Sequence, residues 1–174
     1  ELDERQPPVS SDYASQLWAA WEDAALLAEP LGIRVVRIRT GLVLAADGGF
    51  LKRLLLPFKL ALGGPIGNGR QWMPWIHLHD QVALMDFLLH HEAACGPYNA
   101  CAPAPVRSRA FAKALGAALH RPAFMPLPAI FLKLGLGELS VLLLGGQRAL
   151  PKRLLEAGFV FRFNTLETAL ADLL

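Results

Sequence analysis

Apolar residues recur every three or four positions between residues 12 and 28, which predicts an amphipathic helix with one buried face. The positions expected on that face are Ala14, Leu17, Trp18, Trp21, Ala24, Ala25 and Ala28. Pro30 and Gly32 end the pattern, and the β-branched run 33–39 then predicts a strand. A helix, a short glycine turn and such a strand form the second half of a βαβ crossover, so we expect an α/β fold with a parallel sheet.

Further elements follow in the same alternation. Residues 40–44 continue as an extended run. A helix with Leu51, Leu54, Leu55, Phe58 and Leu62 on one stripe comes next, and Pro57 inside it should kink or split that helix. Another helix is predicted for residues 80–91, and a short buried strand for residues 96–100.

The last third of the chain is mostly helical in pattern. A helix capped by Ser108 should bury Phe111, Ala114, Leu115, Ala118 and Leu119, and it ends at Pro122. Residues 126–156 indicate short leucine-rich helices. Residues 158–163 alternate as a strand does, and Thr165 is placed to cap a final amphipathic helix with Leu166, Ala169, Leu170 and Leu173 inward.

The stretch from residue 63 to residue 80 combines a glycine-rich turn, two tryptophans and a short strand-like run. Glycine and proline at this density mark tight turns and close approaches of the backbone. Large aromatic side chains beside amide and guanidinium groups are typical of a pocket wall. A loop whose tryptophans fill the core explains the same pattern, and the pattern leaves both readings open.

Composition narrows the classes of protein. The 174 residues are 53% hydrophobic and 18% charged. The formal charge of +2 is too small to argue for nucleic-acid binding, and the basic residues are scattered, so we expect no nucleic-acid partner. Cys95 and Cys101 are too few for a disulfide framework and lack zinc-site spacing. The acidic, proline-containing residues 1–12 do not read as a signal peptide, and no uninterrupted apolar span reaches membrane length, so we expect a cytoplasmic protein without membrane contact.

Several polar residues are candidates for chemistry. His77 and His79 share one strand face beside Asp80, but no third or fourth ligand is identifiable, so we expect no metal, a core hydrogen bond for His77 and a helix-capping role for Asp80. We expect Glu22 to be a solvated helix carboxylate. Arg37 and Arg39 either meet a ligand phosphate at the strand end or form a salt bridge at the sheet edge. Asn99 in a buried strand favours a pocket.

The sequence contains no P-loop, no GxGxxG and no GxSxG motif. The chain nevertheless resembles the carboxyl-terminal half of the extended short-chain dehydrogenase/reductases. More narrowly, it resembles the atypical subgroup of the nucleoside-diphosphate-sugar epimerase family that carries a small C-terminal domain of uncharacterised function. The stretches that carry the resemblance are residues 21–25, 35–44, 56–80, 96–103 and 142–163.

The resemblance implies the carboxyl-terminal part of a doubly wound NAD(P)-binding Rossmann fold plus a small, mostly helical substrate lobe. Its glycine-rich phosphate loop would lie upstream of Glu1 in a longer protein. Residues 1–48 would end the dinucleotide-binding domain, residues 49–122 would form the substrate lobe interleaved with the last Rossmann elements, and residues 123–174 a small C-terminal helical domain. The resemblance also implies NADP as cofactor, with NAD as the alternative, a small-molecule substrate such as a nucleotide sugar or a carbonyl compound, and a homodimer as one option.

The family's catalytic pair is missing. Extended reductases carry a Tyr-x-x-x-Lys pair on the helix that begins here near residue 12, and alignment on Glu22 places Ala14 and Trp18 at those positions. The arginine that sugar-nucleotide epimerases place before the Tyr-Ile-His-like motif appears as Met73. These departures leave the catalytic residues unknown.

The resemblance assigns cofactor contact to Arg39, Thr40, Gly41 and Leu42, and a substrate cleft to Gln71, Trp72, Met73 and Trp75. Asn99 joins the substrate-binding set because it is a polar residue in a buried strand. Three functions fit: an NADP-dependent oxidoreductase or epimerase-like protein with an unusual catalytic apparatus, a catalytically silent dinucleotide-binding sensor or scaffold, and a structural lobe that oligomerises through an exposed leucine-rich face at residues 129–144.

Overall fold

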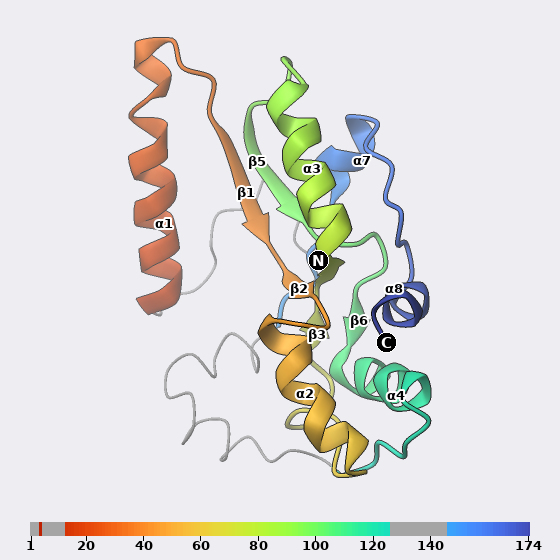
Figure 1. Ribbon diagram of the computed structural model, residues 1–174. Helices are drawn as coiled ribbons and strands as arrows, with labels where there is room; N and C mark the ends of the chain where they lie inside the picture. The colour runs from red at the N-terminus through yellow and green to blue at the C-terminus, as the bar shows by residue number, and fades with distance from the viewer. Residues whose placement is uncertain (1–3, 5–12, 126–145) are drawn as a thin grey trace.

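The computed structural model describes residue 4, residues 13–125 and residues 146–174 (Figure 1). The predicted helical segments between residues 126 and 145, the leucine-rich face at 129–144 and the cap expected from Ser10 or Ser11 lie outside the described residues. Within the described part, no helix is both long enough and apolar enough to cross a membrane.

The predicted helix–turn–strand unit is present. Helix α1 (Tyr13–Leu26) is followed by the 3-10 turn η1 (Glu29–Leu31), which Gly32 ends with a left-handed φ of 76°. Strand β1 (Val36–Thr40) then pairs in parallel with β5 (Gly96–Ala100). The parallel sheet expected from the hydrophobic pattern is therefore confirmed for these strands.

The chain steps sideways at the end of β1. Beyond Gly41, β2 (Leu42–Leu44) pairs in parallel with β4 (Trp75–His77). Two backbone hydrogen bonds carry the ladder across the step, from Gly41 N–H to the carbonyl of Ala100 and from Leu42 N–H to the carbonyl of Pro74. A short antiparallel pair, β3 (Trp72–Met73) with β6 (Val106–Arg107), was not predicted.

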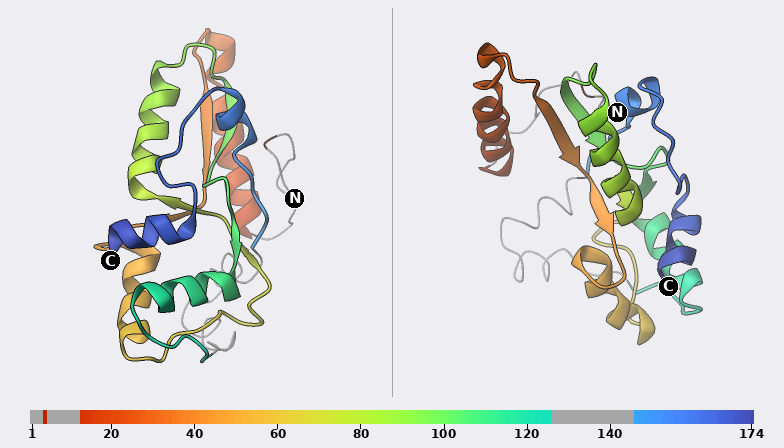
Figure 2. Two further views of the ribbon diagram at one scale, coloured as in Figure 1. Left: turned by 90° about the vertical axis from the view of Figure 1, so that its right-hand side faces the viewer. Right: turned by 45° about the horizontal axis from the view of Figure 1, so that its top comes forward.

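Five helices complete the described structure: α2 (Gly49–Lys59), α3 (Leu78–His90), α4 (Ser108–Ala118), α7 (Lys152–Glu156) and α8 (Leu166–Leu173). Pro57 lies inside α2 and does not split it, since one helix runs from Gly49 to Lys59. The ribbon views place β1 between α1 on one side and α3 on the other, while α2, α4 and α8 gather near β3 and β6 (Figures 1 and 2).

Two clusters of buried apolar side chains form the core. One lies among α2, β4, α4 and α8 and contains Leu51, Trp75, Phe111 and Leu170. The other lies beneath α3 and β5 and contains Ile76, Leu84, Tyr98, Leu154, Phe159 and Phe161. Residues of the C-terminal segment 154–170 belong to both clusters, so this one segment packs against both.

Four predictions about individual segments are wrong. Trp18 and Trp21 are 49% and 65% exposed, because α1 makes few contacts with the other described elements. Leu62 lies beyond the end of α2 and is exposed. Residues 158–163 form no strand, although burial alternates along them. Arg107, not Ser108, is the N-cap of α4, and the Ser108 hydroxyl instead accepts a hydrogen bond from Ile66 N–H at 3.0 Å. Thr165 does cap α8.

Candidate functional site at the strand ends

The carboxyl ends of β1 and β5 bring two predicted site residues together. The parallel register sets Arg39 beside Asn99 and Thr40 beside Ala100. Ligands of open α/β sheets bind outside the carboxyl ends of the strands, so this edge is the place where the fold expects a ligand. Thr40 is exposed at the end of β1, whereas Gly41 and Leu42 are partly buried where the chain steps to β2.

Glu22 of α1 holds both arginines of β1. Its carboxylate accepts hydrogen bonds from Arg37 Nη1 at 2.7 Å and from Arg39 Nε at 2.6 Å and Nη2 at 2.9 Å. The bond from Arg39 is the main reason that the pKa of Glu22 is lowered, and the same bond raises the pKa of Arg39. The expectation of a solvated carboxylate at Glu22 is therefore wrong. Of the two readings of Arg37 and Arg39, the structure contains the salt bridge.

A second carboxylate, which the sequence analysis did not identify, lies behind the same edge. Glu4 is buried, and its Oε1 accepts hydrogen bonds from the backbone N–H of Asn99 at 3.2 Å and of Arg153 at 3.3 Å. These partners lie 95 and 149 residues away, so no local pattern around Glu4 could have revealed it. Burial and, to a smaller degree, the Glu4 charge raise the pKa of the Cys101 thiol to about 12, which keeps Cys101 protonated and unreactive.

The C-terminal segment closes this edge with backbone carbonyls. The Asn99 side-chain amide donates to the carbonyl of Leu150 at 3.0 Å, and the Cys101 thiol donates to the carbonyl of Ala149 at 3.5 Å. The amide of a buried asparagine needs such partners. Asn99 therefore connects the end of β5 to residues that lie about fifty positions further along the chain.

Close backbone approach explains the glycine after β1. A Cβ atom built on Gly41 would lie 2.5 Å from the carbonyl oxygen of Pro74, the same oxygen that accepts from Leu42 N–H. Only glycine lets the strand step sideways here without pushing β2 away from β4. The predicted cofactor segment is thus a backbone junction between the two strand pairs.

The predicted substrate residues of the central stretch have different surroundings. Trp75 is fully buried and its indole N–H donates to the carbonyl of Ala104 at 3.0 Å, and Met73 is also buried. Both therefore belong to the core, in line with the alternative reading of this stretch. Gln71 and Trp72 are partly exposed, and the Gln71 amide donates to the carbonyl of Ile66 at 3.0 Å. Contact of any of these side chains with a substrate stays a prediction.

His77 begins helix α3 and makes the core contacts that were expected of it. Its Nδ1 accepts from His79 N–H at 3.0 Å, its Nε2 lies 3.3 Å from Asp172 Oδ2, and its ring stacks on Phe163 with centroids 3.9 Å apart. Burial lowers the pKa of His77 more than the nearby carboxylates raise it. His77 is also the N-cap of α3, so the capping role predicted for Asp80 is wrong.

Asp80 instead holds the C-terminal segment. Its buried carboxylate accepts from the backbone N–H of Arg162 at 3.0 Å and of Phe163 at 2.9 Å. Among the described residues, the segment before α8 has no neighbouring strand, and these two bonds hold its backbone instead. One side chain thus satisfies two backbone N–H groups that a neighbouring strand could otherwise have satisfied.

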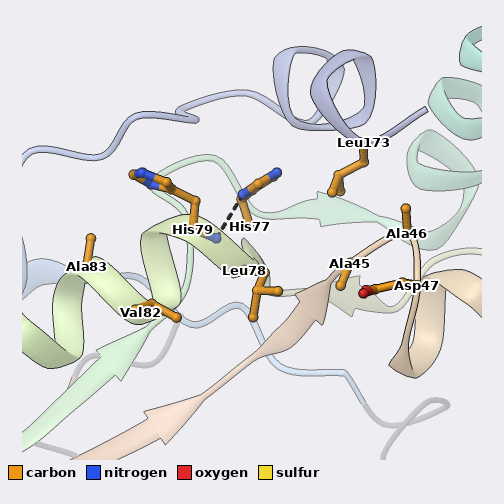
Figure 3. A pocket seen from close by; sticks show the side chains of 9 residues that line it. All are labelled: Ala45, Ala46, Asp47, His77, Leu78, His79, Val82, Ala83 and Leu173. Atoms are coloured by element: carbon orange, nitrogen blue, oxygen red, sulfur yellow. Dashed lines mark hydrogen bonds between the residues drawn. The ribbon is translucent and has the colours of Figure 1, made fainter.

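A hollow of about 630 Å³ opens beside His77 (Figure 3). Its lining is mostly apolar, with alanines that follow β2 on one side and Leu78, Val82 and Leu173 on the other. His79 and Asp47 lie at its border in the close-up view. No group of three or more histidine, cysteine or acidic side chains within the described ranges is arranged to hold a metal ion.

Comparisons with known proteins agree with this architecture. Residues 127–173 match a family model described as a domain of unknown function, DUF1731. The mouse epimerase family protein SDR39U1 is 43% identical over 173 residues, which cover 99% of this chain and 59% of the mouse protein. The crystal structure of human SDR39U1 (isoform 2) with NADPH is 39% identical, with a TM-score of 0.93 over 99% of this chain and 58% of that one.

A nucleoside-diphosphate sugar epimerase from Corynebacterium glutamicum is also similar, with 28% identity, a TM-score of 0.77 and coverage of 99% of this chain and 33% of that one. The chain thus has the α/β fold of the short-chain dehydrogenase/reductases. More narrowly, it is similar to the carboxyl-terminal part of the epimerase family proteins, and its residues 127–173 match the DUF1731 model. The chain spans 59% of the length of the mouse relative.

Proposed function

We propose that this chain is part of an NADP-binding, epimerase- or oxidoreductase-like protein of the short-chain dehydrogenase/reductase class. The observation that carries the proposal is the similarity to human SDR39U1, whose crystal structure contains NADPH, across the whole described architecture. Arg39, Thr40, Gly41 and Leu42 would contact the cofactor, because they lie at the carboxyl end of a parallel strand. NAD remains the alternative cofactor.

The substrate would be a small molecule, either a nucleotide sugar or a carbonyl compound, bound near Gln71, Trp72 and Asn99. Met73 and Trp75 would support this site from the core beneath it. In this proposal, residues 1–48 end the dinucleotide-binding domain, residues 49–122 form the substrate lobe and residues 123–174 form the small C-terminal domain. The proposed assembly is a homodimer. Free Cys95 and Cys101 favour the reducing cytoplasm as the proposed compartment.

A second function is favoured by a specific observation at α1. Trp18 stands where the family carries its catalytic lysine, and its indole cannot donate the charged hydrogen bond that lysine supplies. A protein that binds NADP but lacks the acid/base pair would serve as a dinucleotide sensor or scaffold. Turnover of any carbonyl or nucleotide-sugar substrate distinguishes the enzyme from this alternative.

Titration of NADPH and NADH into the natural full-length protein tests the proposal, with nucleotide fluorescence as the readout. Arg39→Ala should weaken NADPH binding by about tenfold, because it removes a charged hydrogen-bond donor from the strand end. Glu22→Gln is the matched control, since it breaks the ion pair to Arg39 but leaves the guanidinium in place. It should keep NADPH affinity within about threefold if Arg39 itself contacts the cofactor.

Absence of binding of either nucleotide to the wild-type protein would overturn both the enzyme and the sensor proposals. Equal losses in Arg39→Ala and Glu22→Gln would show that the ion pair acts through the structure of the strand end and that Arg39 does not touch the cofactor. Circular dichroism of each variant shows whether it has folded before binding is compared.

A further inference from the structure

We propose that the end of the molecule formed by α2 and α4 docks on an anionic lipid membrane, lying on its surface without crossing it. This interaction goes beyond the proposed function and does not depend on it. It replaces the expectation of no membrane contact, which rested on the lack of a spanning segment. A protein that lies on a membrane needs no such segment, but it needs exposed apolar side chains among basic ones.

The lysines and arginines at this end have no acidic neighbours in the sequence. Residues 48–79 and residues 93–125 contain no aspartate or glutamate. Their eight lysines and arginines are all exposed: Lys52, Arg53, Lys59, Arg70, Arg107, Arg109, Lys113 and Arg121. None of these cations forms an ion pair with another described residue. The formal charge of +2 hides this imbalance, because the acidic residues lie in other parts of the chain.

The fold brings the two acid-free stretches together. Strand β3 of the first stretch pairs with β6 of the second. Beyond α4, Arg121 Nε donates to the carbonyl of Lys59 at 3.2 Å. The N–H of Met125 then donates to the carbonyl of Gly63, also at 3.2 Å. Figures 1 and 2 show α2 and α4 at the same end of the molecule, so this end is basic throughout.

Exposed apolar side chains lie where these last two hydrogen bonds join the stretches. They come from the end of α2, the loop after it and the residues that follow α4, and each is between 44% and 73% exposed: Leu56, Leu60, Leu62, Phe124 and Met125. Lys52, Leu56 and Leu60 are four positions apart, so they share one face of α2 up to its C-cap. Such leucine and phenylalanine side chains can enter the lipid while the neighbouring cations contact the phosphates.

This combination favours a membrane over the other partners of a basic surface. Nucleic acid would be bound through the cations, and the exposed leucines and Phe124 would have no role. A second copy of the chain would bring the same basic surface against itself, and like charges repel. An anionic membrane attracts the cations and also takes up the apolar side chains.

Co-sedimentation of the natural full-length protein with lipid vesicles tests the proposal. Vesicles with equal parts of phosphatidylcholine and phosphatidylglycerol should bind the wild type, and more weakly as the salt concentration rises. Vesicles of phosphatidylcholine alone should bind much less. Phe124→Ala should weaken binding by about tenfold, because it removes an apolar side chain from the lipid. Lys59→Gln should weaken it by about fivefold, because it removes one cation near the surface.

Val160→Ala and Arg162→Gln are the matched controls. Val160 is 85% exposed and Arg162 is exposed, but both lie in the segment before α8 and away from α2. Both variants should bind vesicles as the wild type does. NADPH titration of the same four variants should show unchanged affinity, so failure of this proposal is distinguishable from failure of the proposed function.

Several results would overturn the proposal. Equal binding to both kinds of vesicle would show that anionic lipid is not recognised, and equal losses in the control variants would place the contact elsewhere. Without vesicle binding, a DNA duplex bound in a way that Lys59→Gln weakens and Phe124→Ala does not would assign the surface to nucleic acid. Concentration-dependent dimerisation that Phe124→Ala abolishes, again without vesicle binding, would assign it to a second copy.

Discussion

His77 connects the start of α3 to the C-terminal segment, and its titration should appear in the stability of the protein. Its pKa in the folded state is lowered from 6.5, so the unfolded chain binds the proton first as the pH falls. The groups that face it are Asp172, Asp80 and His79. The stability that neutral His77 contributes is present above pH 6.5 and is lost as the pH falls from there toward the lower, folded-state pKa.

The test replaces His77 by asparagine, whose side-chain oxygen can still cap α3. Wild type should lose free energy of unfolding by at most about 1.4 kcal/mol per pH unit below pH 6.5 because of this group, and His77→Asn should lack that share. Urea unfolding between pH 5 and 8 measures the slope. His90→Asn is the control, since the His90 side chain is 71% exposed. Equal slopes in wild type and His77→Asn would contradict the prediction.

At the scale of single residues, the sequence predicts that a buried polar side chain is hydrogen-bonded, but it does not predict which group is its partner. The core hydrogen bond of His77 was predicted, because a histidine within an apolar strand has to be satisfied. The partners of Glu22 were not predictable, because they depend on how the turns of α1 align with β1. Glu4 shows the same limit more strongly, since its partners come from β5 and from the N-terminus of α7.

Strand geometry at the end of β1 depends on one glycine. Gly41→Ala should destabilise the protein by about 1–3 kcal/mol, because the new methyl group would meet the Pro74 carbonyl oxygen and separate β2 from β4. Gly48→Ala is the matched control: its Cβ would meet nothing within 4 Å, and its φ of −152° suits any residue. Chemical denaturation compares the two. A cost for Gly48→Ala as large as that for Gly41→Ala would contradict the proposed clash.

At the scale of elements, periodicity succeeded where an element buries one continuous face. It predicted β1, β5, α4 and α8, all of which pack in the described core. It failed at residues 158–163, where burial alternates but no strand forms, and where Asp80 binds the N–H groups of Arg162 and Phe163. Strands β3 and β6 have two residues each, which is too short for any period to be visible.

At the scale of the whole molecule, the C-terminal segment connects the two buried apolar clusters. Phe159 and Phe161 belong to the cluster beneath α3, whereas Phe163, Leu166 and Leu170 belong to the cluster around α4. The small C-terminal domain at residues 123–174 was implied by the family resemblance and stays a prediction, and periodicity within α8 does not show which elements receive its apolar face. In the structure, α8 packs against α4 of the neighbouring segment.

This arrangement predicts that the end of the chain unfolds together with the rest. Leu170→Ala should lower the free energy of unfolding by about 2–5 kcal/mol, because Leu170 is fully buried and its truncation leaves a cavity. Leu174→Ala, at a site that is 46% exposed on the same helix end, should cost less than about 1 kcal/mol. Tryptophan fluorescence and far-ultraviolet circular dichroism should then follow one shared transition in Leu170→Ala, shifted to lower denaturant. A separate early transition seen only by circular dichroism would mean that α8 melts alone, and that the C-terminal segment is attached to the two clusters without holding them together.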